Sequence, residues 1–222
     1  MTTSAGVLFS GGLDSAVLLA LERRDGREVQ PIHVRAGLAW EDAEARAIAR
    51  VLAHPAFAHG VRPVRTLTVD MRDVYPSTHW AVVGTPPAYD TPDEDVYLEG
   101  RNLVLIAKAS VLGARLGFDR LALGTLSGNP FPDATPEFLD SIARTISLGL
   151  ARPMAVVAPL AQMHKEDVIR IGMELGVPLH LTLSCMNPQG DRHCGRCSKC
   201  RERIDAFRVA GVLDKTEYSR FV

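Results

Sequence analysis

Two clusters of residues in this sequence are of types that carry chemistry, one near each end of the chain. The first is Ser10-Gly11-Gly12-Leu13-Asp14-Ser15, which separates an apolar run from an apolar stretch of helical character. Its glycines let the backbone approach a ligand closely, and its N–H groups, together with the start of a helix, favour an anion. The segment therefore predicts a phosphate-binding loop, with Phe9 and the six residues after it as candidate contacts.

The loop differs from the other common phosphate-binding patterns. A Walker A loop needs Gly-Lys followed by Ser or Thr, and no lysine follows here; G-x-G-x-x-G does not match either. The alternative without a ligand is a glycine-rich turn between a strand and a helix. Asp14 has two interpretations: it helps to place Mg²⁺ or orients the loop, or it caps the helix and complements the helix dipole.

The second cluster consists of all the cysteines of the chain, which are Cys185, Cys194, Cys197 and Cys200. The spacing C-x₈-C-x₂-C-x₂-C suits a tetrahedral zinc site, and four protein ligands leave no open position for catalysis. We therefore expect structural Zn²⁺, with Gly195 in a tight turn and a helix over residues 198–210. An iron–sulfur cluster is the main alternative, because the last three cysteines fit part of a ferredoxin pattern.

Apolar runs and helical stretches alternate along the chain between these clusters. Strands are predicted at residues 7–9, 29–34, 61–69, 121–123 and 154–157. Helices are predicted at residues 15–24, 41–52, 103–116, 136–148 and 165–175. This alternation predicts an α/β fold with a doubly wound, mostly parallel sheet, in which ligands bind at the carboxyl ends of the strands.

No linker divides the chain before about residue 183. We expect a nucleotide-binding α/β domain over residues 1–183 and a small, helical metal-binding region over residues 184–222. Residues 70–100 are rich in Pro, Asp and Thr, and they are long for a connection, so they form either a functional loop or a lid.

Composition and charge narrow the class of protein. Hydrophobic residues make up 46% of the chain, which is enough for a core, and the net charge of −1 lacks the basic field of a general nucleic-acid binder. The sequence shows no signal-peptide pattern and no apolar run long enough to cross a membrane. We expect a cytoplasmic protein with neither a membrane nor a nucleic acid as its partner.

The glycine loop and the cysteine pattern together resemble the 7-cyano-7-deazaguanine (preQ0) synthase family of the queuosine pathway, within the PP-loop ATP pyrophosphatase superfamily. Further matches lie between the two clusters. They are Gly100-Arg101-Asn102, similar to "GRN"; Phe131-Pro132-Asp133 with Pro136-Glu137-Phe138, similar to "YPDCRPEF"; and Pro159-Leu160, Lys165 and the stretch to Ser184-Cys185, similar to "TPL…K…LGVPL…SC".

The resemblance implies an adenine nucleotide alpha hydrolase-like fold, ATP with Mg²⁺, structural zinc and a homodimer. It also implies a carbon–nitrogen ligase. Such an enzyme activates the carboxylate of 7-carboxy-7-deazaguanine as an acyl-adenylate, accepts ammonia, and converts the amide to the nitrile with a second ATP, releasing AMP and pyrophosphate.

On this basis Asp14, Arg101 and Lys165 are the candidate catalytic residues, because loop N–H groups and cations stabilise negative charge on phosphates. Asn102 and Asp133 join the loop as candidate nucleotide contacts. Each has a structural alternative: Lys165 as a surface lysine, Arg101 as an ion-pair partner, Asn102 as a helix cap and Asp133 as a turn former.

The sequence departs from the family pattern where a substrate pocket is expected. Residues 34–41 replace a "YGQ"-type segment, Ala134-Thr135 replace Cys-Arg, and residues 76–95 resemble an insertion. ATP and the metal are therefore better supported than the deazapurine. Trp40 either stacks on a planar substrate or packs in the core.

Three other functions follow from the same motifs. One is a related PP-loop ligase or amide synthase that adenylates a different carboxylate. The second is a tRNA-modifying enzyme, which the near-zero net charge and four metal-bound cysteines argue against. The third is a non-catalytic nucleotide sensor, which the intact glycine loop argues against.

Overall fold

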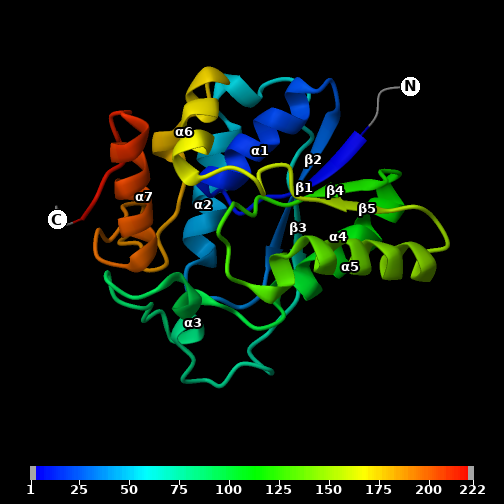
Figure 1. Cartoon of the computed structure of the whole chain (residues 1–222), viewed down its shortest axis with the longest axis horizontal. Helices are drawn as coiled ribbons and strands as arrows, with labels where there is room; N and C mark the ends of the chain where they lie inside the picture. Colours follow the sequence, from blue (N-terminus) through cyan, green and yellow to red (C-terminus); the bar gives the residue numbers. More distant parts are fainter. Residues whose placement is uncertain (1–3, 220–222) are drawn as a thin grey trace.

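The computed structural model describes residues 4–219, and its centre is a five-stranded parallel sheet (Figure 1). The strand order is β3-β2-β1-β4-β5, and every neighbouring pair runs parallel. The strands are β1 Ser4–Leu8, β2 Glu28–Arg35, β3 Arg65–Thr68, β4 Arg120–Ala122 and β5 Ala155–Val157. The order reverses between β1 and β4, which confirms the predicted doubly wound α/β fold.

Helices cover both faces of this sheet (Figure 1). The helices among the described residues are α1 Leu13–Arg24, α2 Glu41–Leu52, α3 Trp80–Val83, α4 Arg101–Leu116, α5 Pro136–Gly149, α6 Lys165–Glu174 and α7 Ser198–Ala210. The short α3 lies apart from the sheet (Figure 1). One core cluster joins α1, α2, α6 and α7 to the sheet, and another joins α4 and α5 to it. None of the helices in residues 4–219 is long and apolar enough to cross a bilayer.

The predicted elements form with small shifts of their bounds. Thr135 caps α5, since its Oγ1 accepts the N–H of Phe138 at 3.2 Å. The largest difference is at β3, which begins at Arg65, whereas a strand was expected from residue 61. Val61 makes only an isolated bridge to Val29, and Pro63 has no N–H with which to continue the ladder.

Residues 70–100 are packed against other parts of the chain. They contain α3 and a 3₁₀ turn, Asp93–Val96. Arg201 of α7 donates hydrogen bonds to the backbone oxygens of Tyr89, at 2.6 Å, and Thr91, at 3.0 Å. The segment is therefore held against α7.

Helix α7 shares the core of the α/β domain. Its Ala206 and Phe207 are buried in the same cluster as residues of α1 and α6. The C-terminal residues therefore pack on the rest of the chain through this shared core. The expected domain boundary near residue 183 stays a prediction.

Gly113 and Gly149 offer a matched test of packing on the α4 face. A Cβ at Gly113 would collide with the ring of Phe118, which is 1% exposed, whereas no atom lies within 4 Å of a Cβ at Gly149. We expect Gly113→Ala to lower the free energy of unfolding by about 1–3 kcal/mol through overpacking. Gly149→Ala should leave it unchanged or raise it slightly. Urea denaturation followed by circular dichroism measures both, and equal effects would contradict this packing.

Candidate functional site

The glycine loop connects the carboxyl end of β1 to the start of α1. Gly11 has a positive φ of 75°, and a Cβ there would lie 3.0 Å from the backbone N of Ile48 in α2. Only glycine meets both conditions without strain. Gly12 is the N-cap residue of α1, so the N–H groups of the first turn remain available to an anion.

Beside the loop lies a hollow of two connected lobes. The smaller lobe, about 280 Å³, lies at the carboxyl ends of β1, β2 and β4 and is lined by residues that include Ile32, Leu123 and Thr125. The larger lobe, about 610 Å³, extends toward α6 and α7 and is lined by residues that include Trp80, Lys165, Lys199 and Glu202. The residues that line both lobes include Ser10, Gly12, Asp14, Glu44 and Arg101.

Four polar atoms on these walls are buried without a hydrogen-bond partner among residues 4–219. They are Asp14 Oδ1, Asp93 Oδ1, Arg101 Nε and Thr125 Oγ1. Buried polar groups in folded proteins are almost always satisfied. Their convergence on one hollow indicates a site for a polar ligand that carries both charged and neutral groups.

Lys165 contacts two carboxylates. Its Nζ lies 3.0 Å from Asp14 Oδ2 and 2.6 Å from Glu202 Oε1. Burial lowers the pKa of Lys165, but the two carboxylates outweigh that effect and hold it above its ordinary value. Burial raises the pKa of Glu202, and Lys165 and Lys199 reverse this, bringing it to about 2. Lys165 and Glu202 are therefore both charged at neutral pH.

The position of Lys165 is set by the first turn of α6. His164 is the N-cap residue, and its N–H donates to Asp167 Oδ2 at 3.3 Å, as in a capping box. The Lys165 side chain is 13% exposed, which does not fit an ordinary surface lysine. Glu202 was missing from the sequence-based candidates, because an acidic residue on an amphipathic helix usually faces solvent.

Asn102 and Asp133 contact each other. The backbone N–H of Asn102 donates to Asp133 Oδ2 at 2.9 Å, and its side-chain amide donates to Asp133 Oδ1 and to the Asp133 backbone oxygen, each at 3.2 Å. Burial raises the pKa of Asp133, although the hydrogen bonds from Asn102 act against it. The pair anchors the first turn of α4 at the wall of the smaller lobe.

A buried group that the sequence did not indicate lies where the two lobes meet. Glu44 accepts a hydrogen bond from Trp40 Nε1 at 3.2 Å and lies 3.2 Å from His33 Nε2. Trp40 stacks on Trp80, with ring centroids 5.7 Å apart and planes 12° apart. His33 and Glu44 are polar residues at buried positions of β2 and α2, but so are Gln30 and Glu41, so the sequence carries no signal that sets His33 and Glu44 apart.

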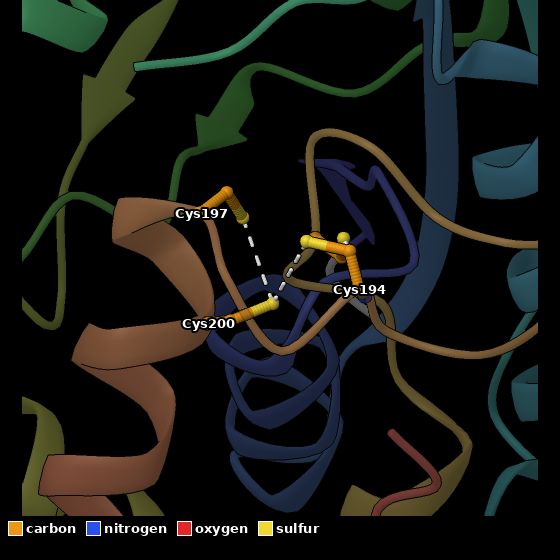
Figure 2. Close-up of side chains that lie close together, drawn as sticks. Cys194, Cys197 and Cys200 are labelled. Carbon is orange, nitrogen blue, oxygen red and sulfur yellow. Dashed lines mark hydrogen bonds between the residues drawn. The ribbon is translucent and has the colours of Figure 1, made fainter. Parts of the chain in front are cut away.

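The four cysteine sulfurs all lie within 4.8 Å of one another, so they can hold a metal ion. Sγ of Cys200 lies 3.9 Å from that of Cys194 and 3.5 Å from that of Cys197 (Figure 2). Tetrahedral coordination with bonds of about 2.3 Å requires sulfur separations of about 3.8 Å. The geometry therefore suits a single ion, and an iron–sulfur cluster would need wider spacing because several metal atoms separate the thiolates.

Backbone groups around the sulfurs also fit bound thiolates. The N–H groups of Asn187 and Cys194 donate to Cys185 Sγ at 3.3 and 3.2 Å. Gly195 has a positive φ of 74°, in agreement with the expected tight turn. His193 lies outside the sulfur cluster, and its Nε2 accepts the N–H of Ser184 at 3.0 Å.

A model of the family described as queuosine biosynthesis protein QueC matches residues 4–211. The chain belongs to the QueC family. A 7-cyano-7-deazaguanine synthase from Methanothrix thermoacetophila is 36% identical over 223 residues, which cover 95% of this chain and 96% of the relative. Another, from Anaeromyxobacter dehalogenans, is 33% identical over 97% of this chain and 96% of the relative. The predicted family is therefore confirmed.

Two solved structures share the fold of this QueC-family chain. A predicted subunit of tRNA methyltransferase from Methanocaldococcus jannaschii has a TM-score of 0.51 at 17% identity, covering 78% of this chain and 75% of that chain. A 4-thiouridine synthetase, in a complex with RNA and bound ATP, has a TM-score of 0.50 at 19% identity, covering 91% and 50%. At these identities the likeness concerns the fold alone.

The structure gathers the sequence-based candidates of this QueC-family chain around one hollow. The glycine loop, Asp14, Arg101, Asn102 and Asp133 line it, and Lys165 reaches it from α6. The four cysteines form a separate cluster at the start of α7. The individual roles of these residues stay predictions, while their shared location follows from the fold.

Glu202 provides a test of the Lys165 contacts. Glu202→Gln removes a charged hydrogen-bond partner from a lysine that is 13% exposed, so we expect the free energy of unfolding to fall by about 1–3 kcal/mol. Glu174→Gln, at an exposed position of α6, should change it by less than about 0.5 kcal/mol. Urea denaturation at pH 7 compares the two, and a Glu202→Gln variant as stable as the control would show that the contact contributes nothing.

Proposed function

We propose that the chain is an ATP-dependent carbon–nitrogen ligase that converts 7-carboxy-7-deazaguanine and ammonia to 7-cyano-7-deazaguanine. Membership of the QueC family and the names of full-length relatives support the product. The observation that carries the ATP-dependent chemistry is the glycine loop, which borders both lobes beside the unpartnered Asp14 Oδ1 and Arg101 Nε.

The reaction needs two activations, because a carboxylate and an amide are both poor electrophiles. The substrate carboxylate attacks the α-phosphorus of ATP, and pyrophosphate leaves as the acyl-adenylate forms. Ammonia displaces AMP to give the amide, with loss of a proton. The amide oxygen then attacks a second ATP, pyrophosphate leaves again, and loss of AMP and of the nitrogen-bound protons yields the nitrile.

The residues around the loop are suited to the charge that develops on the phosphates. The N–H groups at the start of α1, Lys165 and Arg101 would stabilise the negative charge of the transition state and of leaving pyrophosphate. Asp14 would hold the Lys165 ammonium toward the phosphates through its Oδ2. Its unpartnered Oδ1 suits a Mg²⁺ ion, which would supply further charge neutralisation when it is bound with ATP.

Asn102 and Asp133 have a supporting part in this proposal. Their mutual hydrogen bonds hold the first turn of α4 and thereby Arg101 at the wall of the hollow. Asp133 would contact the nucleotide from the smaller lobe, which it lines.

The direct test is incubation of the purified protein with ATP, Mg²⁺, ammonia and 7-carboxy-7-deazaguanine. Mass spectrometry should detect the nitrile, with AMP and pyrophosphate formed in proportion. Accumulation of the amide without nitrile would identify an amide synthase. Binding of ATP with no consumption of this acid would show that the substrate is another carboxylate.

Asp14 separates catalysis from folding in this assay. We expect Asp14→Ala to lower kcat by at least about 100-fold, because Lys165 loses the partner that directs it to the phosphates. The unfolding free energy should fall by no more than about 1–2 kcal/mol, since Glu202 still pairs with Lys165. Turnover and urea denaturation are measured on the same preparation. A variant that is destabilised but keeps the wild-type kcat per folded molecule would show that Asp14 only caps α1.

We also propose that the four cysteines bind structural Zn²⁺. The four thiolates would fill every coordination position of the ion, and the ion would hold the start of α7 in place. Cys197→Ala should lose both the metal, by elemental analysis, and most of the soluble protein, because zinc binding and folding are coupled. Elemental analysis of the wild type should give about one zinc and no iron per chain. A folded, metal-free and fully active Cys197→Ala variant would contradict the proposal.

The family resemblance supports a cytoplasmic homodimer as well. Light scattering coupled to size-exclusion chromatography tests the dimer, and an elution mass near the 24.1 kDa of one chain would reject it.

A further inference from the structure

The two lobes of the hollow differ in the number of cationic side chains that line them. Arg101 is the one lysine or arginine among the described residues that line the smaller lobe, where Asp14, Glu44 and Asp133 are also found. The larger lobe adds Lys165, Lys199 and Arg201 to Arg101, but its lining also includes the acids Asp14, Glu44, Asp93, Glu166, Glu202 and Asp205, so neither lobe is basic overall. An anionic group can therefore meet several cationic partners in the larger lobe, whereas the smaller lobe offers it Arg101 alone.

The larger lobe also carries a flat aromatic surface. Its wall includes Trp40 and Trp80, the two tryptophans of the whole sequence. Trp40 is 7% exposed and fixed by its hydrogen bond to Glu44, and Trp80 stacks on it with nearly parallel planes. A rigid aromatic surface of this kind binds planar heterocycles by stacking.

We propose that the larger lobe binds the planar heteroaromatic carboxylate with its ring against Trp80, while the smaller lobe takes the adenosine of ATP. The assignment rests on the proposed function, because it requires a reaction between ATP and such an acid. Arg101 lines both lobes, so the acid carboxylate and the α-phosphate would meet beside its unpartnered Nε.

Asp93 adds a polar contact on the same wall. Its Oδ1 is buried and accepts no hydrogen bond within the described part of the chain. Lys199 Nζ and Arg201 Nη2 lie 4.0 and 3.9 Å away, beyond hydrogen-bond distance. The amino and ring N–H groups of a deazaguanine are donors of the kind that would satisfy this oxygen.

The 3₁₀ turn that carries Asp93 is held in place by α7. Arg201 donates to the backbone oxygens of Tyr89 and Thr91, just before that turn. Ala88 forms an antiparallel bridge with Cys197. The side of the larger lobe that Asp93 forms is thus fixed by contacts with α7 and the cysteine region. This side therefore needs little rearrangement when the acid binds.

Intrinsic fluorescence tests the assignment directly, because both tryptophans line the larger lobe. We expect 7-carboxy-7-deazaguanine, added to protein saturated with α,β-methylene-ATP and Mg²⁺, to quench the emission saturably after correction with N-acetyltryptophanamide. Trp80→Ala should raise the Kd and KM of the acid at least about tenfold and change those of ATP less than about twofold. Trp80→Phe should recover most of the affinity, because it keeps an aromatic face.

Val83→Ala is the matched control, since Val83 lies on the same short helix, is 50% exposed and lies outside the lining of both lobes. It should leave every constant unchanged. Calorimetric titration repeats the Kd measurements without an optical signal, and circular dichroism confirms that each variant is folded.

The possible failures are distinguishable. Wild-type protein that forms nitrile, combined with unchanged affinity for the acid in Trp80→Ala, would overturn the lobe assignment and leave the proposed function intact. Saturable quenching by α,β-methylene-ATP alone, with none by the acid, would also overturn the assignment. Wild-type protein that neither binds nor converts the acid would overturn both proposals.

Discussion

The Lys165 ammonium group is the interaction on which the geometry of the hollow depends. It contacts Asp14 in the first turn of α1 and Glu202 in α7, while its own backbone begins α6. Three helices that are distant in sequence therefore meet at one cation. Both carboxylates keep that cation charged despite its burial, so the same contact that fixes the helices also places positive charge beside the glycine loop.

Glu202 can serve in this way because α7 is anchored on either side of it. At its start, Cys197 and Cys200 belong to the thiol cluster. One residue after Glu202, Arg203 is fully buried and donates to the side-chain oxygens of Thr182, Ser184 and Thr216. Burial lowers the pKa of Arg203, yet these acceptors satisfy its donors. The C-terminal region is thus a structural part of the hollow's wall.

How much the sequence could predict depended on whether the deciding contacts were local. Helices α2 and α7 have the bounds that were predicted from the sequence, residues 41–52 and 198–210. The glycine loop and the cysteine cluster were also predictable, because their chemistry lies within short segments. Glu202 and Glu44 were not, since each resembles an ordinary helical acid until tertiary packing brings it to Lys165 or Trp40.

The sequence features that match the family and those that depart from it lie on different segments of the chain that lines the hollow. The glycine loop needs a positive φ at Gly11 and close packing on α2, so its sequence has little freedom. The departing stretches, residues 34–41 and 76–95, supply Trp40, Trp80 and Asp93 to the larger lobe. Backbone geometry that binds phosphate tolerates few substitutions, whereas a wall of side chains can change one contact at a time. Under the proposed function, such a division would let substrate recognition vary while ATP activation is retained.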